Sequence, residues 1–255
     1  MLNNKPKTFY DYENPRKALE AFLNAHDTLE DRMRDAALRR FLMKHLSPIE
    51  NKTVLDVGAG GGIWTRFWLE KRAKVTALDK HHPILEGNRL WNPEAEFVEA
   101  DAVTVELGRK FDIIFVKDMI EHVPDDVGLL TNMVKYLKSD GYLFLTTQNS
   151  LSLNYYLEGG YHYLIGDMGW LGYDPTHVRF YNPITLGRKL KLARLQPVKY
   201  WGTYHLPYRF ETEAIFGRII ESKFFHLVEL LSLNSCFPFN RTGYNIGVLT
   251  KIRRS

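Results

Sequence analysis

The stretch TVLDVGAGGGIWTRFWL, residues 53–69, joins a short apolar run to a carboxylate and four glycines that fall within five residues. The apolar run is typical of a β-strand, and the aromatic-rich segment after Gly62 has helical character. Glycines between a strand and a helix let the backbone turn sharply and approach a ligand closely. The new helix offers free N–H groups and the positive end of its dipole at the same place. Taken alone, the stretch fits a ligand-binding loop and a plain glycine-rich turn equally well.

The residues around this stretch alternate between strand and helix patterns. Before it, apolar residues at three- and four-residue spacing predict two helices within 15–46, with Asn14 as N-cap and Pro15 in the first turn. After it, repeated β-α units favour a mostly parallel sheet that is covered on both faces. The predicted strands are 53–57, 74–79, 96–99, 111–117, 142–147 and 196–204, and the predicted helices are 62–71, 83–91, 125–137 and 184–193.

Acidic residues lie at the carboxyl ends of four successive predicted strands: Asp56, Asp79, Asp101 and Asp118. Ligands of open α/β sheets bind beyond the carboxyl ends of the strands, and clustered acids repel one another unless a ligand uses them. An acid about twenty residues after a glycine loop suits a ribose diol, because a carboxylate accepts two O–H hydrogen bonds. The separation of Gly58 from Asp79 fits this arrangement.

The order of acid and glycines indicates which nucleotide ligand is expected. A dinucleotide loop has the pattern G-x-G-x-x-G and holds a pyrophosphate, whereas here Asp56 precedes Gly58, Gly60 and Gly62. A negative charge beside the loop would repel a pyrophosphate and attract an ammonium group or a sulfonium. This favours S-adenosylmethionine over a nicotinamide cofactor.

Residues 53–149 together resemble the class I S-adenosylmethionine-dependent methyltransferases. The resemblance implies that DVGAGGG holds the methionine part, that Asp79 binds the ribose and that Asp101 meets the adenine edge. It also implies that Asp118 opens the segment beside the methyl group and that YLFLTTQN is the fifth strand. The implied cofactor-binding residues are Asp56, Gly58, Ala59, Gly60, Gly62, Asp79, Lys80, Asp101, Ala102 and Asp118.

The same resemblance implies a Rossmann-like α/β fold with a seven-stranded, mostly parallel sheet. Residues 243–252 would form the seventh strand, which closes the sheet with an antiparallel edge. We expect an N-terminal helical cap at 1–50 and a methyltransferase domain at 51–255. Within this domain, 150–182 would form an aromatic lid loop and 205–240 an acceptor-side insertion before the last strand.

The segment DMIEH resembles the D/E-x-x-E-H segment of quinone-biosynthesis O-methyltransferases and of RNA 3′-terminal 2′-O-methyltransferases. In those families the segment, sometimes with a later histidine, can hold a divalent cation. Asp118, Glu121, His122 and His177 are therefore the candidate metal ligands, and Asp118, His122 and His177 are the candidate catalytic residues. His162 and His205 are further candidates for a general base. The alternative is structural: Glu121 caps or orients, His122 packs under the cofactor, and the segment around His177 docks the helix 184–193.

Two regions of the second half could form the acceptor side. The segment 149–175 is rich in tyrosine, tryptophan and glycine, which favours a lid that stacks on a flat or apolar acceptor. An aromatic filling of an irregular subdomain is the alternative. The apolar face of the insertion could contact a membrane that holds a lipid substrate, or pack on the sheet or on a second subunit.

Composition narrows the functional classes. The chain has 255 residues, a net charge of +4 and a single cysteine, so an intrachain disulfide is impossible and a reducing, cytoplasmic location is expected. We find no signal-peptide pattern, no transmembrane run and no dense basic patch for a large RNA. The sequence thus predicts an S-adenosylmethionine-dependent methyltransferase that O-methylates a small aromatic or lipid-like acceptor. An RNA-end 2′-O-methyltransferase and a non-catalytic cofactor-binding module remain alternatives, and the oligomeric state is open.

Overall fold

The computed structural model describes residues 8–167, 170, 174, 176–205, 223–231 and 233–253. Part of the predicted lid and most of the predicted insertion therefore lie outside the described residues. One sheet has the strand order β3-β2-β1-β4-β5-β7-β6. The strands are β1 (Thr53–Val57), β2 (Lys74–Asp79), β3 (Glu96–Glu99), β4 (Phe111–Lys117), β5 (Leu137–Gln148), β6 (Leu195–Thr203) and β7 (Asn245–Ile252). This confirms the predicted Rossmann-like α/β fold.

Strand directions confirm a parallel half with an antiparallel last strand. Strand β2 runs parallel to β1 and β3, whereas β7 runs antiparallel to β5 and β6. The predicted edge is wrong, because β7 lies between β5 and β6, and β6 is the outer strand. The residues of β6 and β7 explain why β6 lies at the edge of the sheet. Strand β7 is buried over most of its length, while β6 contains Pro197, which has no N–H to donate and suits an edge.

Contacts divide the chain into two compact units. One comprises Met1–Phe115 with Lys135–Gly141, and the other comprises Val116–Val134 with Tyr142–Ser255. The predicted division into a cap at 1–50 and a domain at 51–255 stays a prediction.

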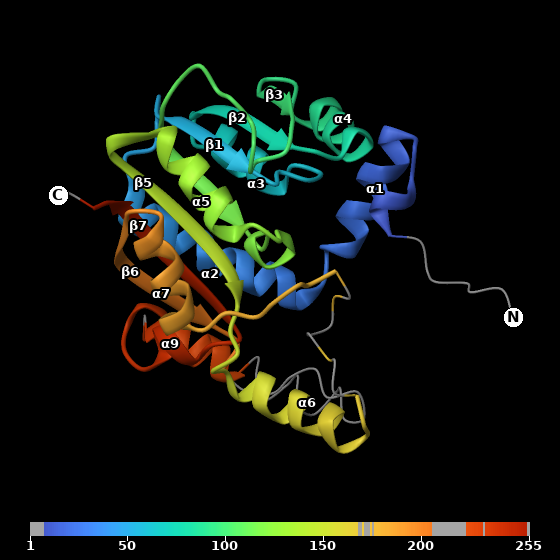
Figure 1. Cartoon of the computed structure of the whole chain (residues 1–255). Coiled ribbons are helices and arrows are strands. Elements are labelled where there is room, and N and C mark those ends of the chain that lie inside the picture. The colour runs from blue at the N-terminus through green and yellow to red at the C-terminus, as the bar shows by residue number, and fades with distance from the viewer. Residues whose placement is uncertain are drawn as a thin grey trace, which may run out of the picture. The chain divides into compact units, whose positions relative to one another are not determined.

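The first unit contains η1 (Phe9–Asp11), α1 (Pro15–Ala25), α2 (Leu29–Leu46), α3 (Ile63–Glu70) and α4 (His82–Trp91). Helix α1 begins as predicted: the side chain of Asn14 accepts hydrogen bonds from the N–H groups of Arg16 and Lys17, and Pro15 occupies the first turn. Helix α1 packs beside α4, as Figure 1 shows. The N-terminal helices are thus part of the unit that contains β1 and the glycine loop.

The second unit contains the remaining helices. They are η2 (Ile120–His122), α5 (Asp126–Lys135), α6 (Leu153–Leu164), α7 (Pro183–Leu192), η3 (Leu233–Ser235) and α9 (Phe239–Thr242), and residues 223–230 are also helical. Helix α7 begins one residue before the predicted 184, and the Asn182 side chain caps it by accepting from the N–H groups of Ile184 and Thr185. No described helix combines the length and the apolar character that a membrane crossing requires.

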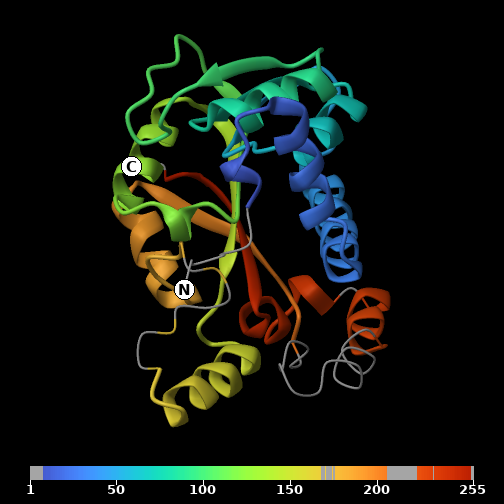
Figure 2. The same ribbon diagram turned by 90° about the vertical axis from the view of Figure 1, so that its right-hand side faces the viewer.

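The predicted lid loop at 150–182 is not a loop throughout, because 153–164 form helix α6, drawn in yellow after β5 in Figure 2. Its first turn is capped by Ser152, whose hydroxyl accepts from the N–H of Tyr155 at 3.0 Å. Gly159 and Gly160 lie inside this helix, although glycine ordinarily disfavours helix interiors. One of them, Gly159, instead permits close approach, since a Cβ there would lie 3.3 Å from the ring of Trp170.

Gly62→Ala should destabilise the fold. Gly62 has a φ of 90°, and a Cβ added there would lie 2.1 Å from Oδ1 of Asn88. We expect a loss of about 2–4 kcal/mol, or roughly 5–12 °C in Tm, measured by thermal unfolding. Gly108→Ala is the matched control, because a Cβ there meets nothing within 4 Å. Equal Tm values for the two variants would contradict the assigned loop conformation.

Candidate active site

The glycine loop between β1 and α3 lies in a conformation that requires glycine. Gly58, Gly60 and Gly62 have φ angles of 69°, 49° and 90°, all in the left-handed region. The N–H groups of Gly58 and Ala59 donate to the carbonyl of Leu78 at the end of β2, at 2.8 and 3.1 Å. The loop is therefore tied to the neighbouring strand that carries Asp79.

A chain of buried polar side chains supports the loop from α3 and α4. The hydroxyl of Thr65 donates to Oδ2 of Asp56 at 2.7 Å and accepts from Nδ2 of Asn88 at 3.2 Å. Nδ2 of Asn92 donates to Oδ1 of Asn88 at 2.9 Å and to the carbonyl of Gly62 at 3.1 Å. All four side chains are nearly inaccessible to solvent. Asp56, predicted as a cofactor residue, thus also anchors this network.

Thr65, Asn88 and Asn92 are not among the site residues predicted from the sequence. A signal was available, because two asparagines four residues apart share one face of a helix whose other inward residues are apolar. Asn88 donates to the Thr65 hydroxyl and Asn92 to the Gly62 carbonyl, 23 and 30 residues away in the chain, so only the fold reveals these contacts.

Asp79 at the end of β2 connects two segments that flank the predicted ribose site. Its Oδ2 accepts from the N–H of Gly60 and its Oδ1 from the N–H of His81, both at 2.9 Å. A carboxylate has about four acceptor positions, so two remain for further donors. The side chain is 8% exposed, which limits competition from water. This arrangement can accept a ribose diol while it holds the glycine loop in place.

The other predicted cofactor residues of the first unit lie close after β2 and β3. Asp101 is exposed, and its Oδ1 accepts from the N–H of Val103 at 2.8 Å, whereas Ala102 is buried. Lys80 is exposed directly after β2. Ala59 packs with Ala77 and Leu85 in a small apolar cluster that includes Phe97 at its margin.

Helix α1 and the residues before it cover the glycine loop. Cβ atoms added at Gly60 and Gly61 would meet the ring of Phe22 at 3.0 and 2.3 Å, so this ring lies directly on the loop. The Tyr10 ring lies 4.5 Å from that of His81, between centroids. On α2, Arg34 pairs with Asp31 and Asp35 of its own helix.

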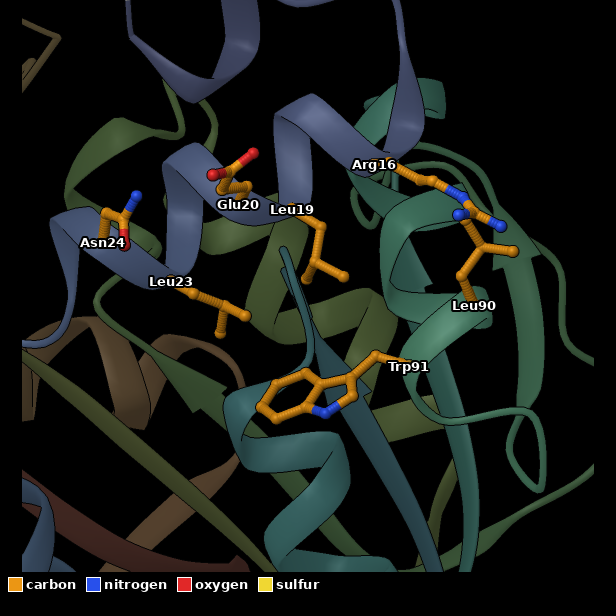
Figure 3. A pocket seen from close by; sticks show the side chains of 7 residues that line it. All are labelled: Arg16, Leu19, Glu20, Leu23, Asn24, Leu90 and Trp91. Carbon is orange, nitrogen blue, oxygen red and sulfur yellow. The ribbon is translucent and has the colours of Figure 1, made fainter.

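A cavity of about 430 Å³ lies between α1 and α4. Figure 3 shows Leu19, Leu23 and Trp91 projecting into it, with Arg16 and Leu90 near one end. Glu20 and Asn24 complete its lining. None of the predicted cofactor residues lines it, so this cavity is separate from the glycine loop.

In the second unit, the fold brings together three of the predicted site residues. One ligand-type atom from each of Glu121, His122 and His177 lies within 4.8 Å of the other two. The imidazole rings are 4.7 Å apart between centroids. The N–H of Val178 also donates to the Glu121 carbonyl at 3.0 Å, which fixes the later segment against η2. We call these three residues the His-Glu cluster.

Glu121 is the most unusual group of the His-Glu cluster. The side chain is inaccessible to solvent, and neither carboxylate oxygen has a hydrogen-bond partner among the described residues. Burial, with a smaller contribution from the negative charge of Asp118, raises the pKa of Glu121 to about 8. A buried carboxyl group favours its protonated, neutral form unless a cation or a hydrogen-bond donor enters the site.

Asp118 stands apart from the His-Glu cluster. Its Oδ1 accepts from the hydroxyl of Thr146 at 2.7 Å, and its Oδ2 contacts Nζ of Lys117 at 2.9 Å. Its φ of 47° is left-handed, a conformation that aspartate tolerates at strand ends. The structure therefore holds this carboxylate in place, but does not bring it into the cluster.

The segment after His177 is held by a buried acid. Asp126 contacts the hydroxyl of Tyr181 at 2.7 Å, the guanidinium of Arg179 at 2.5 Å and Nζ of Lys189 at 3.0 Å. Although burial opposes ionisation, these donors lower the pKa of Asp126. Arg179 and Tyr181 thus dock this segment, while His177 lies in the His-Glu cluster.

The other histidine candidates lie elsewhere. His205 contacts Phe224 and Phe239, and its burial lowers its pKa to about 4. His162 on α6 pairs with Asp167 and stacks on Trp170 at 4.9 Å.

An aromatic group extends from the His-Glu cluster to α6. Phe180 lies 5.9 Å from His177 and 4.7 Å from Tyr155, and Trp170 lies 5.7 Å from Tyr155, between ring centroids. We call Phe180, Tyr155 and Trp170 the aromatic wall. They place flat apolar surface next to the cluster.

Residues 28–200 match a family model described as a methyltransferase domain. The chain belongs to this methyltransferase family. The resemblance to class I S-adenosylmethionine-dependent methyltransferases is confirmed.

Among curated proteins, the chain is similar to the ubiquinone biosynthesis O-methyltransferase of Hydrogenovibrio crunogenus. The two are 32% identical over 126 residues, which cover 47% of this chain and 52% of that protein. The match thus spans about half the length of this relative.

Two solved structures share the fold. One is an S-adenosylmethionine-dependent methyltransferase from Clostridium acetobutylicum, with a TM-score of 0.60, 13% identity and coverage of 92% of this chain and 99% of that one. The other is magnesium protoporphyrin IX methyltransferase from Synechocystis with bound SAH, with a TM-score of 0.58, 11% identity and coverage of 89% and 88%.

Asp79→Ala should weaken binding of S-adenosylhomocysteine by roughly 1.5–3 kcal/mol, or about 10- to 150-fold in Kd, because hydrogen bonds to a charged group are lost. Isothermal calorimetry measures this change. Asp140→Ala, which removes an exposed acid, is the control and should bind like wild type. An unchanged Kd for Asp79→Ala would exclude Asp79 from the cofactor site.

Burial of Glu121 should make stability depend on pH. The folded pKa of about 8 lies above the ordinary value of 4.5, so between these pH values the folded state binds more protons and stability falls as pH rises. Glu121→Gln removes this contribution. In chelator, the free energy of unfolding of the variant relative to wild type should rise by on the order of 2–4 kcal/mol as pH increases from 4.5 to 8. Urea unfolding measures this difference. Parallel pH profiles for the two proteins would contradict the assigned burial.

Proposed function

We propose that this chain transfers the methyl group of S-adenosylmethionine to an oxygen atom of a small aromatic or lipid-like acceptor. The single observation that carries the choice of oxygen is the His-Glu cluster, which joins a buried carboxylate to two imidazoles. An oxygen nucleophile must lose a proton during transfer, and imidazole is the side chain best suited to accept one near neutral pH. The similarity to a ubiquinone biosynthesis O-methyltransferase supports this choice.

The glycine loop and Asp79 support S-adenosylmethionine as the methyl donor. Asp79 keeps acceptor capacity for the ribose hydroxyls, and the loop with Asp56 beside it favours a cationic ligand over a phosphate. Asp101 and Ala102, which follow β3, would meet the adenine edge. Phe22 and Tyr10 cover this region and would limit access of water to the bound cofactor.

Methyl transfer is an in-line displacement. The acceptor oxygen forms a bond to the methyl carbon while the carbon–sulfur bond breaks and its electron pair stays on sulfur. The hydroxyl proton passes to an imidazole, for which His122 and His177 are the candidates. Most of the catalytic effect comes from positioning the two reactants and excluding water.

The His-Glu cluster also fits a divalent cation. Its donors are one carboxylate and two imidazoles within 4.8 Å, and the carboxylate oxygens of Glu121 are buried without a described partner. Such a mixed oxygen and nitrogen donor set suits Zn²⁺ or Mn²⁺ better than Mg²⁺. A bound cation would lower the pKa of an acceptor hydroxyl and orient it. Asp118, the fourth predicted ligand, would contribute through its charge.

The aromatic wall supports a flat or apolar acceptor. Phe180 contacts His177 edge to face, and Tyr155 and Trp170 continue the apolar surface toward α6. A ring stacked on this surface would bring a phenolic hydroxyl next to an imidazole. Contact of the insertion with a membrane remains part of this proposal for lipid-like acceptors.

Methyl-labelled S-adenosylmethionine, offered with catechols, prenylated catechols and short RNA oligonucleotides, tests the proposal. We expect the label on a phenolic oxygen, detected by mass spectrometry. His122→Ala and His177→Ala should lower kcat about 100-fold or more while the Kd of the cofactor changes little. His45→Gln, on α2, is the control. The same assay in chelator, with and without added Zn²⁺ or Mn²⁺, measures the dependence on a cation.

Each other outcome has a defined meaning. Label on the 3′-terminal ribose of RNA would favour the RNA-end methyltransferase. Cofactor binding without transfer to any acceptor class would favour the non-catalytic module. Label on carbon or nitrogen of the small acceptors would overturn the preference for oxygen. Full activity in chelator would exclude a required cation.

A further inference from the structure

We infer that Asp174 and Thr176 are positioning residues that fix the tautomer of His122, with the proton on Nδ1 and the lone pair on Nε2. The inference concerns the cluster to which the proposed function assigns a role, and it rests on that function only for its catalytic meaning. The hydrogen-bond geometry that carries it is independent of the acceptor and of any metal.

A short chain of hydrogen bonds leads from Asp174 to His122. The hydroxyl of Thr176 lies 2.6 Å from Oδ1 of Asp174 and 2.8 Å from Nδ1 of His122. The N–H of Thr176 also donates to Oδ1 of Asp174, at 2.8 Å, which holds the hydroxyl in place beside the carboxylate. Thr176 is therefore fixed between the carboxylate and the imidazole.

Counting protons along this chain leaves one arrangement for a neutral His122. A carboxylate only accepts hydrogen bonds, so the single hydroxyl proton of Thr176 must point to Asp174. The contact with His122 is then a hydrogen bond only if Nδ1 donates its own proton to the Thr176 oxygen. With the opposite tautomer, the hydroxyl proton would have to point to Nδ1. The 2.6 Å contact with Asp174 would then bring two lone pairs together without a proton between them.

Asp174 is held in the ionised form that this arrangement requires. Partial burial opposes ionisation, but the hydroxyl and the N–H of Thr176 outweigh it and lower the pKa of Asp174, with help from the nearby imidazoles of His122 and His177. The carboxylate therefore stays an acceptor across the neutral pH range.

The hydrogen bond made by Nδ1 determines which imidazole nitrogen of His122 can react. Free neutral histidine favours the proton on Nε2, so the chain from Asp174 reverses the ordinary preference. Nε2 then keeps its lone pair and is the nitrogen available to take a proton or to ligate a cation. A partner on one imidazole nitrogen that sets the state of the other is a recurrent device in enzyme sites.

The ¹⁵N chemical shifts of the His122 imidazole test the inference directly. Spectra of the full chain are recorded in chelator at about pH 8.5, where histidine is ordinarily neutral. His122→Ala identifies the His122 signals by their loss. We expect Nδ1 in the protonated range and Nε2 in the lone-pair range. The reverse assignment in the wild-type protein would overturn the inference, whatever the variants do.

Substitutions separate the positioning role from a structural one. Thr176→Val should return His122 mainly to the Nε2-protonated form, and Thr176→Ser should restore the wild-type shifts. Asp174→Ala should also reverse the tautomer, because the Thr176 hydroxyl is then free to donate to Nδ1. Thr131→Val, on the exposed face of α5, is the matched control and should leave the shifts unchanged. Identical shifts in wild type and Thr176→Val would refute the role of Thr176.

Activity provides a second readout where the methylation assay finds an acceptor. Thr176→Val should lower kcat about 10- to 100-fold with little change in the KM of the cofactor, and Thr176→Ser should recover most of the rate. An unchanged kcat in Thr176→Val would refute the positioning role. If the shifts behave as expected and no acceptor is methylated, the proposed function fails while the tautomer assignment stands.

Discussion

The buried polar chain under the glycine loop is the constraint on which the first unit depends. Asn92 donates to the carbonyl of Gly62, and Asn88 and Thr65 connect it to the carboxylate of Asp56. This chain occupies the space where a Cβ of residue 62 would stand, so the glycine and the asparagines require one another. The loop is thereby held in the left-handed turns that bring its backbone next to Asp79.

In the second unit, the unusual feature is the carboxyl group of Glu121, whose ionised form is disfavoured by burial. A charged group in an apolar environment loses several kcal/mol of hydration unless a partner compensates it. Neither carboxylate oxygen of Glu121 has a hydrogen-bond partner among the described residues. Nearby Lys117 and Thr147 offset the effect of burial on its pKa only in part. The carboxylate also lies beside two histidines. Perturbed groups of this kind are concentrated at functional sites, because a ligand, proton or cation supplies the missing compensation. The cluster is therefore better explained by chemistry than by stability.

The two halves of the proposed reaction depend on different kinds of residue. The glycine loop, Asp56 and Asp79 would select a cationic donor through backbone conformation and charge. The His-Glu cluster and the aromatic wall would receive the acceptor through proton transfer and stacking. Family membership agrees with the first half and leaves the second to experiment, since half of a curated relative is matched and the structural neighbours share only the fold.

The sequence by itself determined the strands, most helices, the helix caps and the acids at the strand ends, because apolar periodicity and turn chemistry are local properties. Strands β1 to β4 have the predicted bounds for this reason. Helix α6 was missed, since Gly159 serves a contact with Trp170 that no local pattern records. Only the tertiary structure decided that β6 is the edge strand, and that Asp118 stays with Thr146 while His177 joins Glu121. It also placed Thr176 against His122, 54 residues away in the chain. Such contacts depend on how distant segments pack, and sequence spacing carries no measure of that.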